Sequence, residues 1–420
     1  MALPDKLHFV GIGGAGMAPL AALCVQSGRK VSGSDREMNS KMEHLMTLGA
    51  RVETGHFEDA LEDDTQLLIY SSAVPADNPE RAKAVRLGIP QMCRGAALAE
   101  FTFDYKRVVA VSGAHGKSSI TSIISHILEA NGFEPGYMIG ADFNGRRNYS
   151  SGNGDIFVTE ADESDGTHKL LFPWCGVIPN YDPDHAWSVG GEEQLKANFF
   201  EFASRSQNLI YYNYDEVRAF CAGRGTALDV VPDDFSCAGF FGYEAANVQL
   251  AVKVCELLGC PADKAVSAAK SYPGIARRMS VRLKCENLVI IEDYAHHPTE
   301  VRNSINLLRH KYPEHHLRIL FQPHRYARLE KFFDGFVCEL KKADSLLVFP
   351  VFAAWSEKGK VNSQMLADEC GAVALTGDLQ AAAAEALRTP ADGKPLLVAV
   401  LGAGDVNAVF PYLERETERW

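Results

Sequence analysis

The sequence lacks the features that mark secreted, zinc-ribbon or membrane-spanning proteins. Its ten cysteines are scattered and include no CxxC pair, so zinc ribbons and thioredoxin-like redox motifs are unsupported. No apolar run approaches the roughly 20 residues that a membrane-spanning helix needs. The N-terminal stretch MALPDKLHFVGIGG lacks the charged and apolar regions of a signal peptide. We therefore expect a cytoplasmic protein without membrane insertion, in which most cysteines are buried thiols.

Basic residues are in deficit, with 42 Lys and Arg against 54 Asp and Glu and a formal net charge of −12. A general nucleic-acid binder draws its affinity from cationic contacts to phosphate, so no nucleic-acid partner is expected. A local basic pocket for a phosphorylated small molecule remains compatible with this charge. The chain also has no internal repeat and no low-complexity tract.

Short apolar runs alternate with amphipathic stretches along the 420 residues, a pattern typical of α/β proteins with parallel sheets and crossover helices. The candidate strands are residues 7–10, 67–70, 108–111, 156–159, 177–178, 288–291, 317–321, 346–349 and 396–401. The clearest helix follows Gly116, because isoleucines and leucine recur at helical spacing up to Leu128. Phosphate-like turns near residues 11, 113 and 402 predict three α/β units, with boundaries near residues 105 and 273.

A glycine-rich turn lies between the first predicted strand and an apolar helical stretch. Residues 11–16 read GIGGAG, which has GxGxxG spacing, and Asp35 follows some way downstream. Glycines let the backbone approach a pyrophosphate at a helix N-terminus, and Asp35 would accept from a ribose hydroxyl. The motif suits NAD or another nucleoside diphosphate, and a tight strand–helix turn without a ligand is the structural alternative.

A second phosphate-binding motif occupies residues 112–119, which read SGAHGKSS. It departs from a strict Walker A sequence because Val111 stands where the first glycine is usual. The motif still combines a helix N-terminus with an ammonium and a hydroxyl. Lys117 would neutralise charge on the β- and γ-phosphates, and Ser118 would bind Mg²⁺. A strand directly before it and a helix directly after it favour this interpretation over a chance surface loop.

Acidic residues gather where another predicted strand ends. Residues 160–165 read EADESD, and four carboxylates this close repel one another unless water or a hard cation surrounds them. Ligands collect at the carboxyl ends of strands in open α/β sheets, which favours metal binding. Residues 180–185 (NYDPDH) also follow a strand. A lone histidine is usually a packed or surface residue, but the acids around His185 favour a second metal site.

Histidines, acids and arginines recur in the last third of the chain. Residues 292–300 and 322–328 each follow a predicted strand, and residues 402–405 (GAGD) follow a third. Their side chains are therefore expected to converge at one sheet edge, together with residues 277–278 (RR). Arginine suits bidentate recognition of carboxylate or phosphate. A set of exposed charged loops is the alternative interpretation.

Taken together, these strings resemble the Mur ligase family, in the family's order and across nearly the whole chain. The strings that carry the resemblance are HFVGIGGAGM (8–17), VSGSD (31–35), SSAV (71–74), DNPE (77–80), FQPHRY (321–326) and GAGD (402–405). The string at 321–326 favours the alanine-adding branch. The resemblance implies a Rossmann-like UDP-sugar-binding domain at 1–104, a central ATP-binding P-loop domain at 105–273, and a C-terminal Rossmann-like ligase domain at 274–420.

The resemblance implies ATP-dependent ligation of L-alanine to the lactyl carboxylate of UDP-N-acetylmuramate through an acyl phosphate, with release of ADP and phosphate, in peptidoglycan synthesis. It assigns the UDP-sugar to Gly11, Gly13, Gly14, Gly16, Asp35, Ser71 and Arg325. It assigns ATP to Gly113, Ala114, His115, Gly116, Lys117, Ser118, Ser119, Arg278 and Asp293. It assigns the amino acid to His297, His324 and Arg328, and Mg²⁺ to Ser118, Glu160 and His185. The implied catalytic residues are Lys117, Glu160, His185, Asp293 and His297, where His185 and His297 are candidates for the base.

Three departures separate this chain from the family's pattern. The P-loop has Ala114 and two serines where the family usually has threonines, and serine preserves the hydroxyl. The family's Pro-Gly-x-His-Asn stretch, which contributes to adenine binding, corresponds to residues 238–242 (AGFFG) after a shortened segment at 191–239. Adenine would then stack on Phe240 or Phe241, or be held loosely. Residues 352–357 replace a Tyr-x-Ala-Gly-Glu string, which leaves glycine or serine open as the substrate.

Two other functions stay open at this point. An NAD-dependent oxidoreductase would explain the turn at 11–16 but would leave the motif at 112–119 and the acidic cluster without a role. A degenerate, non-catalytic homologue would bind the UDP-sugar without turning over ATP.

Overall fold

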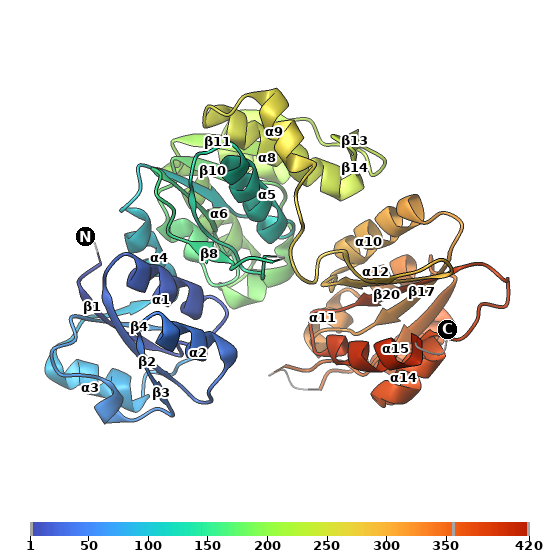
Figure 1. Cartoon of the computed structure of the whole chain (residues 1–420), viewed down its shortest axis with the longest axis horizontal. Coiled ribbons are helices and arrows are strands. Elements are labelled where there is room, and N and C mark those ends of the chain that lie inside the picture. Colours follow the sequence, from blue (N-terminus) through green and yellow to red (C-terminus); the bar gives the residue numbers. More distant parts are fainter. Residues whose placement is uncertain (1–2, 144, 355–357, 418–420) are drawn as a thin grey trace. The chain divides into compact units, whose positions relative to one another are not determined.

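The computed structural model describes residues 3–143, 145–354 and 358–417. The chain divides into two compact units, the first made of residues 1–230 and 247–273 and the second of residues 231–246 and 274–420. Within these described residues, three large sheets, of five, seven and six strands, and one two-stranded hairpin make up the fold (Figure 1). Most strand pairs are parallel, which confirms the α/β class. Each predicted domain range holds one large sheet, and the division into three domains remains a proposal.

The five-stranded sheet has the order β3-β2-β1-β4-β5 and all its pairs are parallel. Its elements are β1 (Lys6–Val10), α1 (Met17–Gln26), β2 (Lys30–Asp35), α2 (Ser40–Thr47), β3 (Arg51–Thr54), η1 (Glu58–Ala60), β4 (Leu67–Tyr70), α3 (Pro79–Leu87), β5 (Gln91–Cys93) and α4 (Arg94–Thr102). Helices α1, α2 and α4 bury their apolar residues against one face, where Leu7 and Phe9 of β1 point. On the other face Val10 packs with Ala84 of α3. The strand order is that of a Rossmann fold without its sixth strand.

The seven-stranded sheet has the order β12-β11-β10-β6-β9-β7-β8. Its strands are β6 (Arg107–Val111), β7 (Gly136–Met138), β8 (Tyr149–Ser150), β9 (Ile156–Glu160), β10 (Cys175–Ile178), β11 (Asn208–Tyr212) and β12 (Thr226–Leu228). The helices of this part are α5 (Lys117–Ala130), η2 (Thr167–Leu170), η3 (Pro183–Ser188), α6 (Glu192–Arg205), α7 (Asp215–Cys221), α8 (Gly242–Leu257) and α9 (Ala262–Ala269). The predicted helix after Gly116 is confirmed as α5, whose isoleucines are buried. Aromatic residues of α6 and α7 pack against one face of the sheet.

The second unit holds the six-stranded sheet, with the order β15-β16-β20-β17-β18-β19. The strands of this sheet are β15 (Ser280–Lys284), β16 (Leu288–Asp293), β17 (His316–Phe321), β18 (Ser345–Val348), β19 (Val373–Ala374) and β20 (Leu396–Leu401). The second unit also holds the two-stranded hairpin, made of β13 (Ser236–Cys237) and β14 (Phe240–Phe241). Its helices are α10 (Pro298–Lys311), α11 (Tyr326–Lys331), α12 (Phe333–Leu340), α13 (Ser363–Cys370), α14 (Leu379–Ala386), η4 (Val406–Val409) and α15 (Phe410–Thr417). Helices α10 and α12 cover one face and α14 and α15 the other (Figure 1). β15 is an edge strand, antiparallel to β16, with a register shift between Val281 and Leu283.

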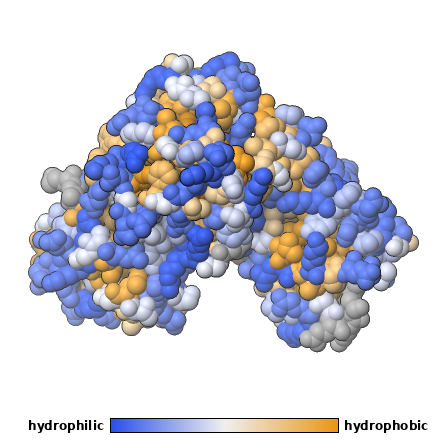
Figure 2. Space-filling view, turned by 45° about the horizontal axis from the view of Figure 1, so that its top comes forward, coloured by the Kyte–Doolittle hydropathy of each residue, from blue (hydrophilic) through white to orange (hydrophobic). Residues whose placement is uncertain are grey.

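All nine strands predicted from apolar runs are confirmed, each within two residues of the observed bounds. The view in Figure 2 shows a mainly hydrophilic surface with hydrophobic areas of limited size. Within the described parts of the chain, no helix is both long enough and apolar enough to cross a membrane.

Candidate active site

The glycine-rich turn joins β1 to α1 and is held by the neighbouring strand β2. The amides of Gly11 and Ile12 donate to the carbonyl of Ser34, at 2.8 and 3.0 Å. Gly11 has a φ of +82°, a conformation that glycine adopts without strain. A side chain at Gly13 would lie 3.0 Å from an Asp35 carboxylate oxygen, and one at Gly16 would lie 3.0 Å from Arg94 Cδ. The backbone conformation therefore favours glycine at Gly11, whereas a side chain at Gly13 or Gly16 would have to displace neighbouring side chains.

Asp35 and Ser71, two of the predicted UDP-sugar residues, lie against this turn. Asp35 Oδ2 accepts a hydrogen bond from Gly13 N at 2.8 Å, and Oδ1 accepts from Arg36 N at 2.7 Å. Both carboxylate oxygens of Asp35 therefore accept hydrogen bonds from backbone amides, and these bonds order the turn. Ser71 Cβ would lie 3.2 Å from a Cβ added at Gly11. The structure brings these predicted residues of the first unit together, and their contacts to a UDP-sugar stay predictions.

The motif at residues 112–119 forms a tight loop between β6 and α5. Gly116 has a φ of +84° and precedes the first residue of the helix, Lys117. A Cβ at Gly113 would lie 2.9 Å from the Asn180 carbonyl oxygen, and one at Gly116 would lie 3.0 Å from Asn247 Oδ1. The Asn180 side chain also accepts from His115 N at 2.9 Å and donates to His115 O at 3.0 Å. The loop is thus clamped by a residue at the end of β10, and it presents the N-terminus of a 14-residue helix.

The Lys117 ammonium is paired with Glu163, an acid to which the sequence pattern gave no individual role. Lys117 Nζ lies 2.7 Å from Glu163 Oε2 and donates to Gly113 O at 2.8 Å. Burial works to lower the pKa of Lys117, but the charges of Glu163 and Asp162 outweigh it and raise the pKa. Glu163 is 1% exposed, and burial raises the pKa of its carboxyl to about 7 against the pull of Lys117. Lys117 is therefore charged at neutral pH while Glu163 titrates there.

Glu160 and Ser118 are brought together beside this pair. The Glu160 carboxylate accepts hydrogen bonds from the Ser118 side chain and the Gly140 amide, and burial raises its pKa. Three acids, Glu160, Asp162 and Glu163, thus surround one ammonium, and a divalent cation would relieve their repulsion. Carboxylate and hydroxyl oxygens are the donors that Mg²⁺ prefers, so these residues fit a magnesium ion. Of His185 the structure describes the backbone, in η3, and its side chain lies outside the described residues.

In the second unit, Asp293 and Arg278 lie close together at the carboxyl end of β16. Asp293 accepts hydrogen bonds from Met279 N at 2.8 Å and Ala295 N at 2.9 Å. Burial raises the pKa of Asp293 to about 6, although the Arg278 charge opposes this. Arg278 Nη1 lies 3.5 Å from Glu300 Oε1, a buried acid at the start of α10. Glu300 is a further residue that the motifs did not single out, because a glutamate early in a helix is ordinary.

The predicted amino-acid residues also lie in this unit. Arg328 Nη1 lies 3.0 Å from His324 Nδ1, and Arg328 is 7% exposed. His297 is buried before the first residue of α10, and its ring lies edge-on to Phe332, with 4.5 Å between the centroids. Arg325, the predicted UDP-sugar residue of this unit, has a φ of +65° and precedes α11. His324 and Arg328 are in contact, and their binding of the amino acid stays a prediction.

The segment predicted to hold adenine forms the hairpin β13–β14 of the second unit. The Phe241 ring stacks on the His310 ring of α10, with centroids 3.6 Å apart and an angle of 1° between the planes. Glu244 of α8 forms an ion pair with Lys311 of α10, with 2.8 Å between the carboxylate oxygen and Nζ. One face of Phe241 is therefore occupied by a side chain, and stacking of adenine on Phe240 or Phe241 stays a prediction.

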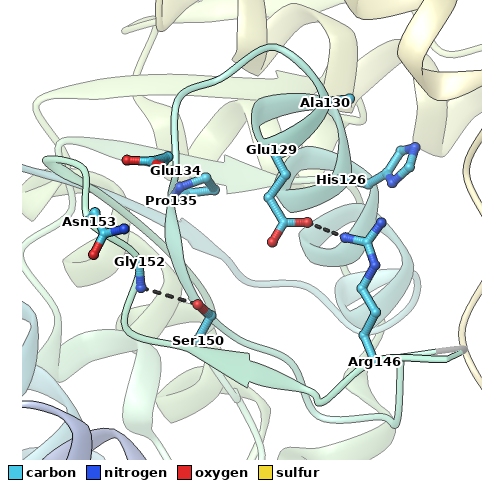
Figure 3. A pocket seen from close by; sticks show the side chains of 9 residues that line it. All are labelled: His126, Glu129, Ala130, Glu134, Pro135, Arg146, Ser150, Gly152 and Asn153. Carbon is cyan, nitrogen blue, oxygen red and sulfur yellow. Dashed lines mark hydrogen bonds and ion pairs between the residues drawn. The ribbon is translucent and has the colours of Figure 1, made fainter.

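A separate cavity of about 590 Å³ lies beside the second half of α5, and its lining includes none of the predicted site residues. Glu129 and Arg146 point toward each other and form an ion pair within it (Figure 3). His126, also in the lining, is held through Nε2 by Ala268 O and Ser271 Oγ, each at 3.1 Å. The charged groups of this cavity thus largely satisfy one another.

The described fold is that of an α/β protein, and the loop at 112–119 joins a strand to the N-terminus of a helix. Residues 6–106 match the Mur ligase family, catalytic domain, and residues 277–404 match the Mur ligase, glutamate ligase domain. The sequence is 32% identical to UDP-N-acetylmuramate–L-alanine ligase of Sorangium cellulosum, over 98% of this chain and 96% of the relative. It is 34% identical to the enzyme of that name from Aquifex aeolicus, over 88% of each chain. The chain therefore belongs to the Mur ligase family.

Solved structures agree on the fold. The crystal structure of UDP-N-acetylmuramate-alanine ligase MurC from Thermotoga maritima matches with a TM-score of 0.80 and 23% identity, over 99% of this chain and 100% of the other. A murein peptide ligase from Psychrobacter arcticus matches with a TM-score of 0.67 and 17% identity, over 98% of each chain. The alignment with the Sorangium relative spans 471 positions, more than the 420 residues here, so this chain lacks residues that the relative has. That the missing residues fall at 191–239 stays a prediction.

Proposed function

We propose that the protein uses ATP to join L-alanine to the lactyl carboxylate of UDP-N-acetylmuramate, a step of peptidoglycan precursor synthesis. Relatives that carry the name of this activity align with nearly the whole chain at 32% and 34% identity. The observation that carries the proposal is that the phosphate-binding loop, with Lys117 at the start of α5, lies against the acids Glu160 and Glu163. Hydride transfer by an NAD-dependent oxidoreductase does not require a lysine at a helix N-terminus beside buried acids.

The first step activates a carboxylate, which is a poor acyl donor at neutral pH. The lactyl carboxylate oxygen attacks the γ-phosphorus of ATP, the bond to the β,γ-bridging oxygen breaks, and an acyl phosphate and ADP result. Lys117 and the amides at the N-terminus of α5 would stabilise the negative charge of the transferred group. Ser118 and Glu160 would hold Mg²⁺, which supplies further charge neutralisation when it is bound.

The second step forms the amide bond. The amine of alanine attacks the acyl carbon, and the tetrahedral intermediate expels phosphate. Arg328, held by its contact with His324, would bind the alanine carboxylate and orient the amine. Arg278 and Asp293 are proposed to complete the ATP site, and His297 remains a candidate for the base that takes the amine's proton.

The experiment that tests the proposal measures phosphate release. The full-length protein is supplied with ATP, Mg²⁺ and UDP-N-acetylmuramate, and L-alanine, glycine or L-serine is added in turn. Release that requires both the sugar nucleotide and L-alanine is the expected result. Faster release with glycine or serine would change the assigned amino acid.

Two controls separate the remaining alternatives. Chelation of Mg²⁺ with EDTA should stop phosphate release, and excess Mg²⁺ should restore it. Binding of UDP-N-acetylmuramate without release under any condition would indicate a non-catalytic homologue. Stabilisation by NAD in place of the sugar nucleotide would contradict the assignment of the turn at residues 11–16.

A further inference from the structure

A buried polar network lies under the glycine-rich turn, on the face of the five-stranded sheet that α3 covers. At its centre is Glu80, the second residue of α3, whose side chain is fully buried. Glu80 Oε2 lies 2.6 Å from His8 Nε2 of β1, and Oε1 lies 2.9 Å from His56 Nδ1. The Ser34 hydroxyl of β2 donates to both oxygens, at 2.7 and 2.8 Å. Ser32 extends the network to the other nitrogen of His8, at 2.8 Å.

The partners of Glu80 keep it ionised in this apolar setting. Val10, Leu68 and Ala84 pack on the same face, and burial alone would raise the pKa of the carboxyl. Hydrogen bonds from His8, Ser34 and His56 outweigh burial, and they hold the pKa of Glu80 below its ordinary value. A buried charge with this many partners is energetically demanding, and loss of one partner leaves the others unsatisfied.

The segments tied to Glu80 are those that surround the glycine-rich turn. Ser34 accepts the amides of Gly11 and Ile12 through its carbonyl, so its position sets the start of the turn. His56 belongs to the segment after β3, whose Gly55 N donates to Asp35 O at 2.7 Å.

The third segment leads from β4 into α3. It begins at Ser71, beside Gly11, and ends at Asn78, whose side chain accepts from Glu80 N at 3.0 Å. The Glu80 carboxylate therefore ties the start of α3 to Ser34 and His56, and the segment from Ser71 to Asn78 is joined to the same point through the Glu80 backbone amide.

We infer that Glu80 is a positioning residue for UDP-sugar binding: its buried carboxylate holds the segments carrying Ser34 and His56 in register with the start of α3, which follows Ser71, around the glycine-rich turn. The inference rests on the proposed function, because it takes the UDP-sugar as the ligand of that turn. Glu80 lies beneath the turn and acts through the backbone that it orders.

The test compares Glu80→Gln with wild type in the full-length protein. Glutamine has the same shape but presents an amide donor where His8, Ser34 and His56 donate. We expect the Kd and KM for UDP-N-acetylmuramate to rise about tenfold or more, the loss expected for one hydrogen bond to a charged group. kcat and the KM for ATP should stay within about twofold, since binding geometry rather than chemistry is perturbed. Glu339→Gln, which alters a carboxylate of α12 that pairs with Lys342, is the matched control and should leave the Kd and KM for the sugar nucleotide unchanged.

The outcomes separate positioning from a general structural role. An unchanged Kd and KM in folded Glu80→Gln would overturn the inference, as would an equal loss in kcat and in ATP binding. If Glu80→Gln does not fold, Ser34→Ala takes its place, and an unchanged Kd in that variant would overturn it. Calorimetric titration with UDP-N-acetylmuramate needs no turnover. A chain that binds the sugar nucleotide without releasing phosphate would contradict the proposed function and still test Glu80.

Discussion

Replacement of Lys117 by methionine is expected to change how stability depends on pH. In wild type, burial sets the pKa of Glu163 to about 7, above its ordinary value of 4.5. The folded chain then binds this proton more tightly than the unfolded chain, so the free energy of unfolding falls as pH rises from about 4.5 to 7 and then levels off. The raised pKa of Lys117 lies far above this range, so Lys117 stays charged in both states.

In Lys117→Met the positive charge that lowers the pKa of Glu163 is absent, so burial raises the pKa of Glu163 further. Above pH 7 the free energy of unfolding of the variant should therefore continue to fall, by up to about 1.4 kcal/mol per pH unit. In wild type the contribution of Glu163 to the free energy of unfolding no longer changes in this range. The variant should also lose turnover, while UDP-N-acetylmuramate binding is retained. Because Glu163 is 1% exposed, solvent does not screen this effect.

The assay is urea unfolding of wild type, Lys117→Met and Lys117→Arg at pH values from about 6 to 8.5, with the free energy of unfolding compared at each pH. The arginine variant keeps a cation and should follow wild type. Parallel curves for wild type and Lys117→Met above pH 7 would refute the argument that Glu163 is the titrating partner. Substantial phosphate release by the folded methionine variant would refute the role of Lys117 in phosphate binding.

Three further outcomes are expected. Ser118→Ala should raise the Mg²⁺ concentration for half-maximal phosphate release roughly tenfold, and Ser118→Thr should not, because only threonine keeps the hydroxyl. Gly33→Ala should lower the free energy of unfolding by about 1–3 kcal/mol, since its Cβ would clash with the backbone carbonyl oxygen of Phe9 and lie 2.6 Å from Ile12 Cδ1, and should weaken UDP-N-acetylmuramate binding measured by calorimetry. Arg318→Met should cost about 2–3 kcal/mol in urea unfolding, because the buried guanidinium donates to the carbonyls of Ala386 and Arg388 at 2.9 and 2.7 Å; an unchanged stability would contradict this.

The elements that the sequence predicts well are those with an apolar pattern of their own. Helix α5 has isoleucines at helical spacing, and β20 is an unbroken apolar run, so both are evident before any tertiary contact is known. Strand β2 reads KVSGSD and escapes such prediction, because Ser32 and Ser34 are polar yet buried. Their hydroxyls are satisfied by His8 and by Glu80, which is distant in sequence, and no local pattern contains that information.

The residues of the candidate site likewise differ in whether a local sequence pattern predicts them. Residues 113–119 are contiguous and predict their own geometry, because a strand, a short loop and a helix N-terminus leave few alternatives. The acidic string at 160–165 predicts a charged strand end but not which acid pairs with Lys117. That choice falls on Glu163, and it depends on how β9 packs beside the helix start. Asn180 and Asn247 likewise contact the loop from distant segments.

The edge of the six-stranded sheet that β15 forms has a consequence for self-association. An exposed edge strand is a template on which another molecule can add a strand, which leads to aggregation. Here β15 runs antiparallel at that edge, its register shifts between Val281 and Leu283, and it carries the cations Arg282 and Lys284. A bulged, positively charged edge pairs poorly with a second copy of itself. This edge of the C-terminal sheet is thereby protected from edge-to-edge growth, and replacement of Arg282 and Lys284 by threonine should make the purified protein more prone to aggregate.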